Sequence, residues 1–455
     1  MSWLRASTLR LRLELIARTI MERRCDRCTR SFKPIRSLLV NTSKRPQGNV
    51  GRARLGISLQ FLTNGLVLAS LLPRLPELKE RFGLSDAEYG LAVVSFPAGA
   101  ILAAALAGVL VRRLGRLPIL IGGTALLAAA LFLAGVAPHP LIFVAAYAVA
   151  GATDAVVDVA QNLQGLRVQA VRGTTIINSL HALWSAGAVT GGALAALAAG
   201  LGVPLSVQLG VTGVLVVLVA WIGGVWAVRG VEVEVDPTPT EPAPGGNHAP
   251  SSTDPTAAKG PPRAVRPSWR TWLLLGALVV IGSMGSASED VVNNWSTLIG
   301  VGVAGLGAAA GVVYVVGFGA QFVGRLLGDP LSDRFGRLNV AMVGAALVAI
   351  GAAVALVVGG GVGVLLGFAL MGYGSATLVP AALAAANEVP GLKPGTGLSL
   401  VSWLMRLGFL VTSPLLGAVA QGEGLRNALW VPVIGGMVAL AAVTALRVRD
   451  GVRVG

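Results

Sequence analysis

Charged residues are scarce in this chain of 455 residues. Asp, Glu, Lys and Arg make up 13% of it, whereas soluble domains carry about 25%. The mean hydropathy is +0.74, and the shortage of charge is concentrated between Leu55 and Leu446. The apolar runs there are about 20 residues or longer, which is enough to cross a bilayer as a helix. These features exclude an ordinary soluble protein and indicate a helical membrane protein with many spans.

Residues that bind metals or perform catalysis are also few. The two cysteines, Cys25 and Cys28, form one CxxC without a second pair or nearby histidines, which is a weak zinc or redox signal. The three histidines lie in different segments without ligand spacing. The sequence has no phosphate-binding P-loop and no nucleophile elbow. We therefore expect no metal, no cofactor, no ATP-driven transport and no enzyme activity.

Positive charge is in excess, with a formal net charge of +15. Residues 1–54 hold 14 Lys and Arg against three acids, so most of the excess lies before the first apolar run. A basic tail in the cytoplasm or at lipid headgroups explains this better than nucleic-acid binding. We expect residues 1–53 to be a poorly ordered tail, with an amphipathic helix on the membrane as the alternative.

Apolar periodicity predicts twelve spans in two groups of six. They are expected near 54–72, 87–111, 118–137, 141–166, 176–200 and 205–228, and then near 271–298, 304–327, 339–358, 362–386, 395–420 and 427–446. Residues 230–270 between the groups are rich in Pro, Ser, Thr and Gly, and such a composition cannot form a packed core. We therefore predict an all-α membrane protein with an N-terminal six-helix bundle (54–229), a flexible linker (230–270), a C-terminal six-helix bundle (271–446) and a short tail (447–455).

Basic residues predict the orientation of these spans. They cluster after the even-numbered spans, and the opposite loops are nearly free of them. The exception, from Arg74 to Arg81, balances its positive charges with Glu77 and Glu80. By the positive-inside rule, both termini and the linker lie in the cytoplasm. We expect a monomer in the cytoplasmic membrane, in contact with lipid and without a nucleic-acid partner.

A short motif recurs at matching positions in the two halves. Residues 108–116 read GVLVRRLGR after span 2, and residues 328–337 read GDPLSDRFGR after span 8. We predict two cytoplasmic gating loops in which glycine allows a tight turn and Asp333 caps a neighbouring helix. A generic basic loop would explain one copy, but two matching copies favour a repeat. The predicted gating-loop residues are Gly108, Arg112, Gly115, Arg116, Asp329, Asp333, Arg334, Gly336 and Arg337.

With these features the chain resembles the major facilitator superfamily over residues 52–446. Within it, the chain is similar to the fucose-permease-like branch, bacterial inner-membrane transporters of undefined substrate. The stretches that carry this likeness are LLPRLPELKERFGLS (71–85), DVAQNLQG (158–165), SLHALWSAG (179–187) and GRLLGDPLSDRFGR (324–337). The resemblance implies two six-helix pseudo-repeats, alternating access and a solute site between the halves. In two places the sequence departs from the family pattern: Arg112 stands where an acid is usual, and Arg406 where an uncharged residue is more common.

The fourth predicted span contains two acids. Asp154, Asp158 and Asn162 are four residues apart, so they share one helix face. An acid at the bilayer centre costs roughly 3 kcal/mol. The acids either bond to neighbouring helices and hold the bundle together, or line a wet path and exchange protons. Because intramembrane acids are functional candidates by default, we favour the second reading and assign proton coupling to Asp154 and Asp158.

Polar side chains predicted near mid-membrane are the candidates for solute binding. Arg406 either holds an anionic group of the solute or pairs with Glu289 or Asp290. His181 and Asn64 are also explained by packing and by a bond between helices, and Trp295 by an anchor at the membrane surface. The candidates are Asn64, Asp154, Asp158, Asn162, His181, Trp184, Glu289, Tyr373, Trp403 and Arg406.

These residues predict a secondary transporter that moves a small polar solute, sugar-like or another metabolite, by alternating access coupled to protons. The alternative within transport is a proton antiporter that exports drugs or metabolites, which suits an apolar cavity containing tryptophans. A membrane sensor without transport is a second class, but no signalling domain is recognisable in residues 1–53 or 230–270. A membrane-embedded enzyme is a third, and it lacks a catalytic constellation.

Overall fold

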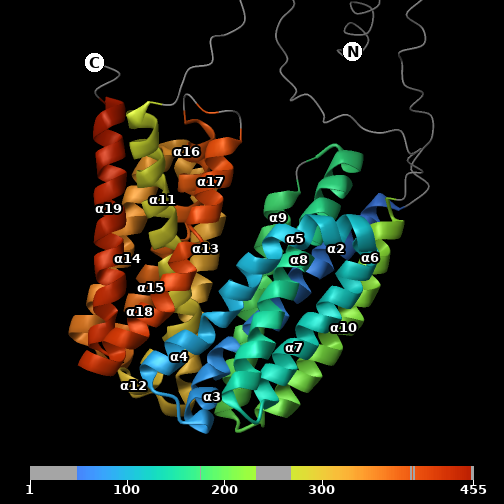
Figure 1. The fold of residues 1–455 in the computed structure, drawn as a ribbon, viewed down its shortest axis with the longest axis horizontal. Helices are drawn as coiled ribbons and strands as arrows, with labels where there is room; N and C mark the ends of the chain where they lie inside the picture. Colours follow the sequence, from blue (N-terminus) through green and yellow to red (C-terminus); the bar gives the residue numbers. More distant parts are fainter. Residues whose placement is uncertain (1–48, 175, 232–267, 390–391, 393–394, 452–455) are drawn as a thin grey trace, which may run out of the picture. The chain divides into compact units, whose positions relative to one another are not determined.

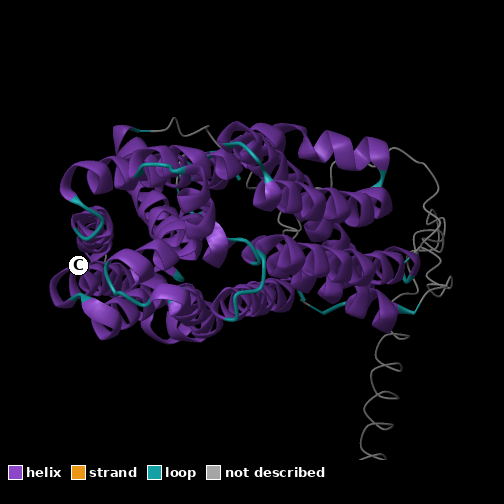
Figure 2. Ribbon diagram, turned by 90° about the horizontal axis from the view of Figure 1, so that it is seen from below, coloured by secondary structure: helices purple, strands orange, loops and turns teal. Residues whose placement is uncertain are grey.

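Every regular element in the described part of the chain is helical (Figure 2). The computed structural model describes residues 49–174, 176–231, 268–389, 392 and 395–451. Twelve helical segments there are long and apolar enough to cross a membrane. The predicted fold class is therefore confirmed. Most of the predicted basic tail, with Cys25 and Cys28, and almost all of the predicted linker lie outside the described residues.

The first six spans run from Val50 to Arg229. Their helices are α2 (Val50–Ala69), η1 (Leu72–Arg74), α3 (Leu75–Phe82), α4 (Asp86–Val93), α5 (Ser95–Leu114), α6 (Arg116–Pro118), the π-helical η2 (Ile119–Gly123), α7 (Thr124–Val136), α8 (Pro140–Arg172), α9 (Ile177–Gly200) and α10 (Leu205–Arg229). We call this set the first bundle.

The other six spans run from Trp269 to Arg447. Their helices are α11 (Trp269–Asp290), the π-helical η3 (Val291–Trp295), α12 (Ser296–Gly302), η4 (Gly307–Ala309), α13 (Gly311–Phe335), α14 (Arg337–Val358), α15 (Gly360–Ser375), α16 (Leu378–Asn387), α17 (Thr396–Leu404), α18 (Leu407–Glu423), η5 (Asn427–Leu429) and α19 (Trp430–Gly451). We call this set the second bundle.

The predicted gating loops prove to be largely helical. α5 continues to Leu114 and α13 to Phe335, and in each half one glycine forms the turn to the next helix. Gly115 and Gly336 have φ of +83° and +84°, a backbone region that side chains beyond glycine rarely adopt. The prediction of loops over 108–116 and 328–337 was wrong, because hydropathy marks the limits of the membrane and not those of the helix.

The predicted cap by Asp333 is not formed either. Its exposed side chain accepts no hydrogen bond from any other residue that the structure describes, and the N-cap position of α14 is occupied by Gly336. The matching one-residue turns in the two halves remain, and they fit the predicted internal repeat.

Close helix packing within the first bundle brings α2 against α9. A Cβ added to Gly65 would lie 2.1 Å from the carbonyl oxygen of Trp184, and one added to Gly187 would lie 2.0 Å from that of Leu62. Only glycine lets two helix backbones approach so closely. This packing places Asn64, the residue before Gly65, next to the Trp184 side chain.

Helices of the two bundles meet in two main pairs, α4 with α18 and α9 with α13 (Figure 1). Further contacts join α12 to α3 and to η1. We call the end of the helices formed by α3, α12 and the start of α4 the far end, because it lies opposite the end where α2 begins and α19 ends. At the far end the Tyr89 hydroxyl donates a hydrogen bond to the backbone carbonyl of Asn294 in the other bundle.

Candidate functional site

Asp154 belongs to a hydrogen-bonded chain of three side chains from three helices. The Trp184 indole nitrogen on α9 donates to Asn64 Oδ1 on α2 over 2.7 Å. Asn64 Nδ2 in turn donates to Asp154 Oδ1 on α8 over 2.9 Å. Since the amide uses its oxygen and its nitrogen at once, its orientation is fixed by both partners. Asp154 is therefore hydrogen-bonded to the neighbouring helix α2.

Asp158, one turn along the same face of α8, has different surroundings. It is exposed, and its only side-chain hydrogen bond to a described residue comes from Asn162 Nδ2 on its own helix over 2.9 Å. It interacts electrostatically with His181 of α9 and with Arg406 of the second bundle. One of these partners belongs to the other bundle, so the exposed carboxylate lies within electrostatic reach of the second bundle.

His181 has charged groups of both signs within electrostatic reach. Its side chain is exposed and packs edge-on against Phe61, with ring centroids 5.3 Å apart. It interacts electrostatically with Asp158 and with Arg325 of the second bundle. The imidazole therefore combines a packing contact with a position among ionisable groups from both bundles.

One polar link between the bundles contains a residue that sequence reasoning missed. The Arg325 guanidinium on α13 is 3.1 Å from Glu289 of α11, in an ion pair whose side chains are 32% and 16% exposed. Arg325 also donates to Ser185 Oγ of α9 in the first bundle over 3.4 Å. A signal was present in the sequence, since Arg325 is a charge inside the predicted eighth span.

This ion pair argues against one of the two alternatives for Arg406, in which it pairs with Glu289 or Asp290. Glu289 is taken by Arg325, and Asp290 accepts hydrogen bonds from Ser413 and Asn294. Arg406 forms no ion pair with any described residue. It lies at the break between α17 and α18, where it occupies the N-cap position of α18.

The remaining aromatic candidates are less closely connected. Trp403 is 62% exposed and lies one helical turn before Arg406. Tyr373 is half-buried and its hydroxyl has no hydrogen bond to another described residue. Trp184 faces the second bundle, with its ring centroid 6.2 Å from that of Phe318.

Trp295 is not the surface anchor that the sequence suggested. It is fully buried, and its indole nitrogen donates to Ser413 Oγ over 3.0 Å. Its ring meets Tyr89 of the first bundle edge-on, with centroids 5.0 Å apart. Position near a span end misled the prediction, because this end of the span is covered by the other bundle.

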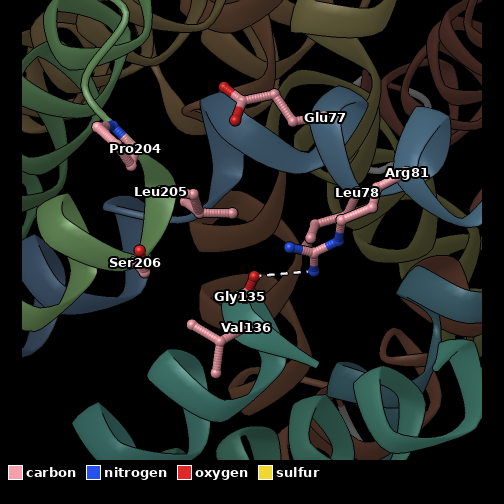
Figure 3. Close-up of a pocket in the computed structure, with 8 residues that line it drawn as sticks. All are labelled: Glu77, Leu78, Arg81, Gly135, Val136, Pro204, Leu205 and Ser206. Carbon is pink, nitrogen blue, oxygen red and sulfur yellow. Dashed lines mark hydrogen bonds between the residues drawn. The ribbon is translucent and has the colours of Figure 1, made fainter. Parts of the chain in front are cut away.

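A separate cavity of about 420 Å³ lies at the far end of the first bundle, between α3, α7 and α10 (Figure 3). Its polar lining includes Glu77 and Arg81, and Arg81 donates to the carbonyl oxygen of Gly135 over 2.9 Å. It contains none of the candidate residues predicted from the sequence. The interaction network between the bundles is therefore the better candidate for the transport site.

Metal ligation gains no support from the arrangement of side chains. Within the described ranges, no three His, Cys, Asp or Glu side chains come close enough together to hold a metal ion.

The sequence profile of the Major Facilitator Superfamily matches residues 57–391 and, in a second overlapping match, residues 308–454. The chain belongs to the major facilitator superfamily. It is therefore a membrane transporter with several spans and not an enzyme. The profile names the superfamily only, so the fucose-permease-like branch stays a prediction.

Relatives of this superfamily protein cover most of its length. It is 28% identical to the membrane protein MosC of Rhizobium meliloti over 398 residues, which is 87% of this chain and 90% of MosC. It is 27% identical to an uncharacterised transporter of the superfamily in Yersinia pestis over 372 residues, which is 81% of this chain and 89% of the relative.

Solved structures with the same fold include the nucleoside transporter NupG. A variant of NupG superposes with a TM-score of 0.66 at 13% identity, over 87% of this chain and 99% of NupG. A second NupG structure gives 0.60 at 15% identity, over 88% and 98%. Identities this low establish the shared fold alone.

Proposed function

We propose that this protein moves a small polar solute across the cytoplasmic membrane by alternating access, and that the movement is coupled to protons. Both termini are cytoplasmic in this proposal, as the distribution of basic residues suggests. The far end then faces the outside.

The observation that carries the proposal is a pair of opposite charges on the two bundles. Asp158 of the first bundle and Arg406 of the second interact electrostatically, yet neither forms an ion pair with a described residue. Charges within a membrane span are costly and usually face a bundle interior or a wet cavity. A polar solute between the bundles would replace water around both groups.

The two acids of α8 suit different tasks. Asp154 is held by Asn64, which in turn is held by Trp184, so its geometry responds to the packing of α2 and α9. Asp158 is exposed, and its side chain has no hydrogen bond to another helix that the structure describes. In this proposal Asp158 exchanges the proton with water or solute. Asp154 couples this protonation change to the packing of α2 and α9 through its hydrogen bonds.

Arg406 is the candidate for binding an anionic or strongly polar group of the solute. A guanidinium is a planar cation that offers five hydrogen-bond donors. The test is a thermal-shift screen, in which binding of sugars, organic acids and amphipathic drugs to the purified protein is measured by the change in its melting temperature. Arg406→Ala should abolish the shift by acids and spare the shift by uncharged ligands, and unchanged shifts by acids would remove this role.

Proton coupling is tested in proteoliposomes that enclose a pH-sensitive dye. A solute found by thermal shift should cause proton movement when it is added, and a gradient of two pH units should drive its accumulation by up to about 100-fold for one coupled proton. Asp158→Asn and Asp154→Asn should abolish or strongly reduce both effects.

The matched control is Glu80→Gln, an exposed carboxylate on α3 outside this site, which should behave like the parent protein. Active protein whose transport ignores the pH gradient would refute the coupling, as would unchanged coupling in both aspartate variants.

A further inference from the structure

Another intramembrane carboxylate, Asp290, lies away from the acids of α8. It is the last residue of α11, directly before the π-helical η3, and its residue is only 2% exposed. It accepts a hydrogen bond from Ser413 Oγ of α18 and a second, over 2.8 Å, from Asn294 Nδ2. It forms no ion pair with any residue described by the structure.

The two residues that donate to Asp290 are also those against which the first bundle packs. The Tyr89 hydroxyl of α4 donates to the backbone carbonyl of Asn294. A Cβ on the next residue, Gly90, would lie 2.3 Å from the carbonyl oxygen of Ser413. Helix α4 therefore covers both donors. The contact between α4 and the second bundle that closes the far end also encloses Asp290.

Among the described residues, none of the groups that interact electrostatically with Asp290 is a cation. Its neighbour Glu289 is acidic and already holds Arg325. Tyrosines of the first bundle supply the other neighbours that interact with it electrostatically. The titratable and charged groups facing Asp290 or lying near it are Glu289 of α11, Tyr89 of α4, Tyr147 of α8 and, at the start of α4, Asp86, which is paired with Lys79 over 3.1 Å.

We propose that Asp290 is an additional proton-binding site, which carries a proton while the far end is closed and releases it when α4 separates from α18. An ionised carboxylate enclosed without a cation pays a desolvation cost that two neutral hydrogen bonds offset only in part. Separation of α4 exposes Ser413 and Asn294 and lets water reach the carboxylate. This inference deepens the proton coupling proposed above and rests on it.

The direction of the pH effect follows from linkage. The closed state binds the proton more tightly than the open state, so low pH favours the closed far end. Raising the pH removes this advantage and favours the open far end. Between the two proton affinities, the ratio of closed to open molecules falls up to tenfold per pH unit for a single proton.

The test measures the far end itself, without solute or gradient. In the full chain, Cys25 and Cys28 are replaced by Ser, and spin labels are attached through Leu201→Cys and Glu423→Cys, two exposed positions at the far end of the two bundles. Pulsed electron paramagnetic resonance in lipid nanodiscs then gives the distance distribution from pH 5 to pH 9. The parent should show a short distance at low pH and a growing long-distance population as the pH rises.

Asp290→Asn imitates the protonated acid, so it should keep the short distance at every pH. Asp86→Asn, a carboxylate at the same interface that is partly exposed to water, should retain the response of the parent. A parent without pH response, or an Asp290→Asn variant with the response of the parent, overturns the proposal.

Ser413→Ala covers the case in which Asp290→Asn fails to fold. Loss of this donor makes the ionised carboxylate costlier in the closed state, so the midpoint should move to higher pH, and an unchanged midpoint overturns the proposal. Loss of solute-induced proton movement with an intact pH response of the labels would instead refute the proposed transport coupling alone.

Discussion

Gly90→Ala tests whether the contact between α4 and α18 is a gate or a fixed part of the fold. The added Cβ would lie 2.3 Å from the carbonyl oxygen of Ser413, about 1 Å inside ordinary van der Waals contact. The Cβ is bonded directly to the α4 backbone and the oxygen belongs to the α18 backbone, so no side-chain rotation can relieve the overlap. Since the two helices belong to different bundles, separation of the bundles relieves it completely.

The size of the effect follows from the cost of overpacking. One extra methyl group in a packed interface costs about 1–3 kcal/mol. If this cost applies only when the far end is closed, the ratio of closed to open molecules falls by about 5- to 150-fold. A population that is almost entirely closed in the parent would then become a measurable mixture.

The readout is the spin-label pair at Leu201 and Glu423. Gly90→Ala should add a long-distance population and leave the melting temperature nearly unchanged. Gly99→Ala is the matched control, because its Cβ would lie 2.0 Å from the carbonyl oxygen of Ala148 within the first bundle. That variant should lower the melting temperature without changing the distance. If Gly90→Ala lowers the melting temperature and adds no long distance, the contact is part of the fold and the reasoning fails.

Two further substitutions probe the interaction network between the bundles. Glu289→Gln removes the negative partner of Arg325 and should destabilise the protein by about 1–2 kcal/mol, because both side chains are mostly buried. Thermal unfolding measures this loss. The double variant with Arg325→Met should recover part of it, and no recovery would show that the pair contributes nothing. Trp184→Phe keeps an aromatic ring but removes the 2.7 Å donor to Asn64, which should cost about 0.5–1.5 kcal/mol. The exposed Trp403→Phe should cost much less in the same thermal assay, and equal losses would contradict a specific role for the Trp184 bond.

The fold was accessible from the sequence because one physical requirement dominates it. Each span must be apolar over about 20 residues, and nothing in the polar remainder of the chain imitates that pattern. The predicted limits failed where a helix leaves the hydrocarbon region without ending. α8 runs to Arg172 and α13 to Phe335, since charged residues outside the bilayer are still good helix formers.

Contacts between distant residues were beyond the reach of sequence spacing. The pairing of Arg325 with Glu289 joins residues 36 positions apart, and Asp290 meets Ser413 across 123 positions. Periodicity states which residues share a helix face but not which helix that face meets. For this reason the sequence offered Glu289 as a candidate residue but could not identify Arg325 as its partner.

The two acids of α8 differ in their hydrogen bonds because of a single neighbouring residue. Asp154 and Asp158 are one turn apart on one face, and the sequence treats them alike. Asn64 hydrogen-bonds only to Asp154, because the close approach of α2 to α9 at Gly65 holds the Asn64 amide beside that residue. A bulkier residue at Gly65 would move α2 away from α9 and release Asp154 from its neighbour. The difference between the two carboxylates is therefore set by a glycine, a residue that has no side chain.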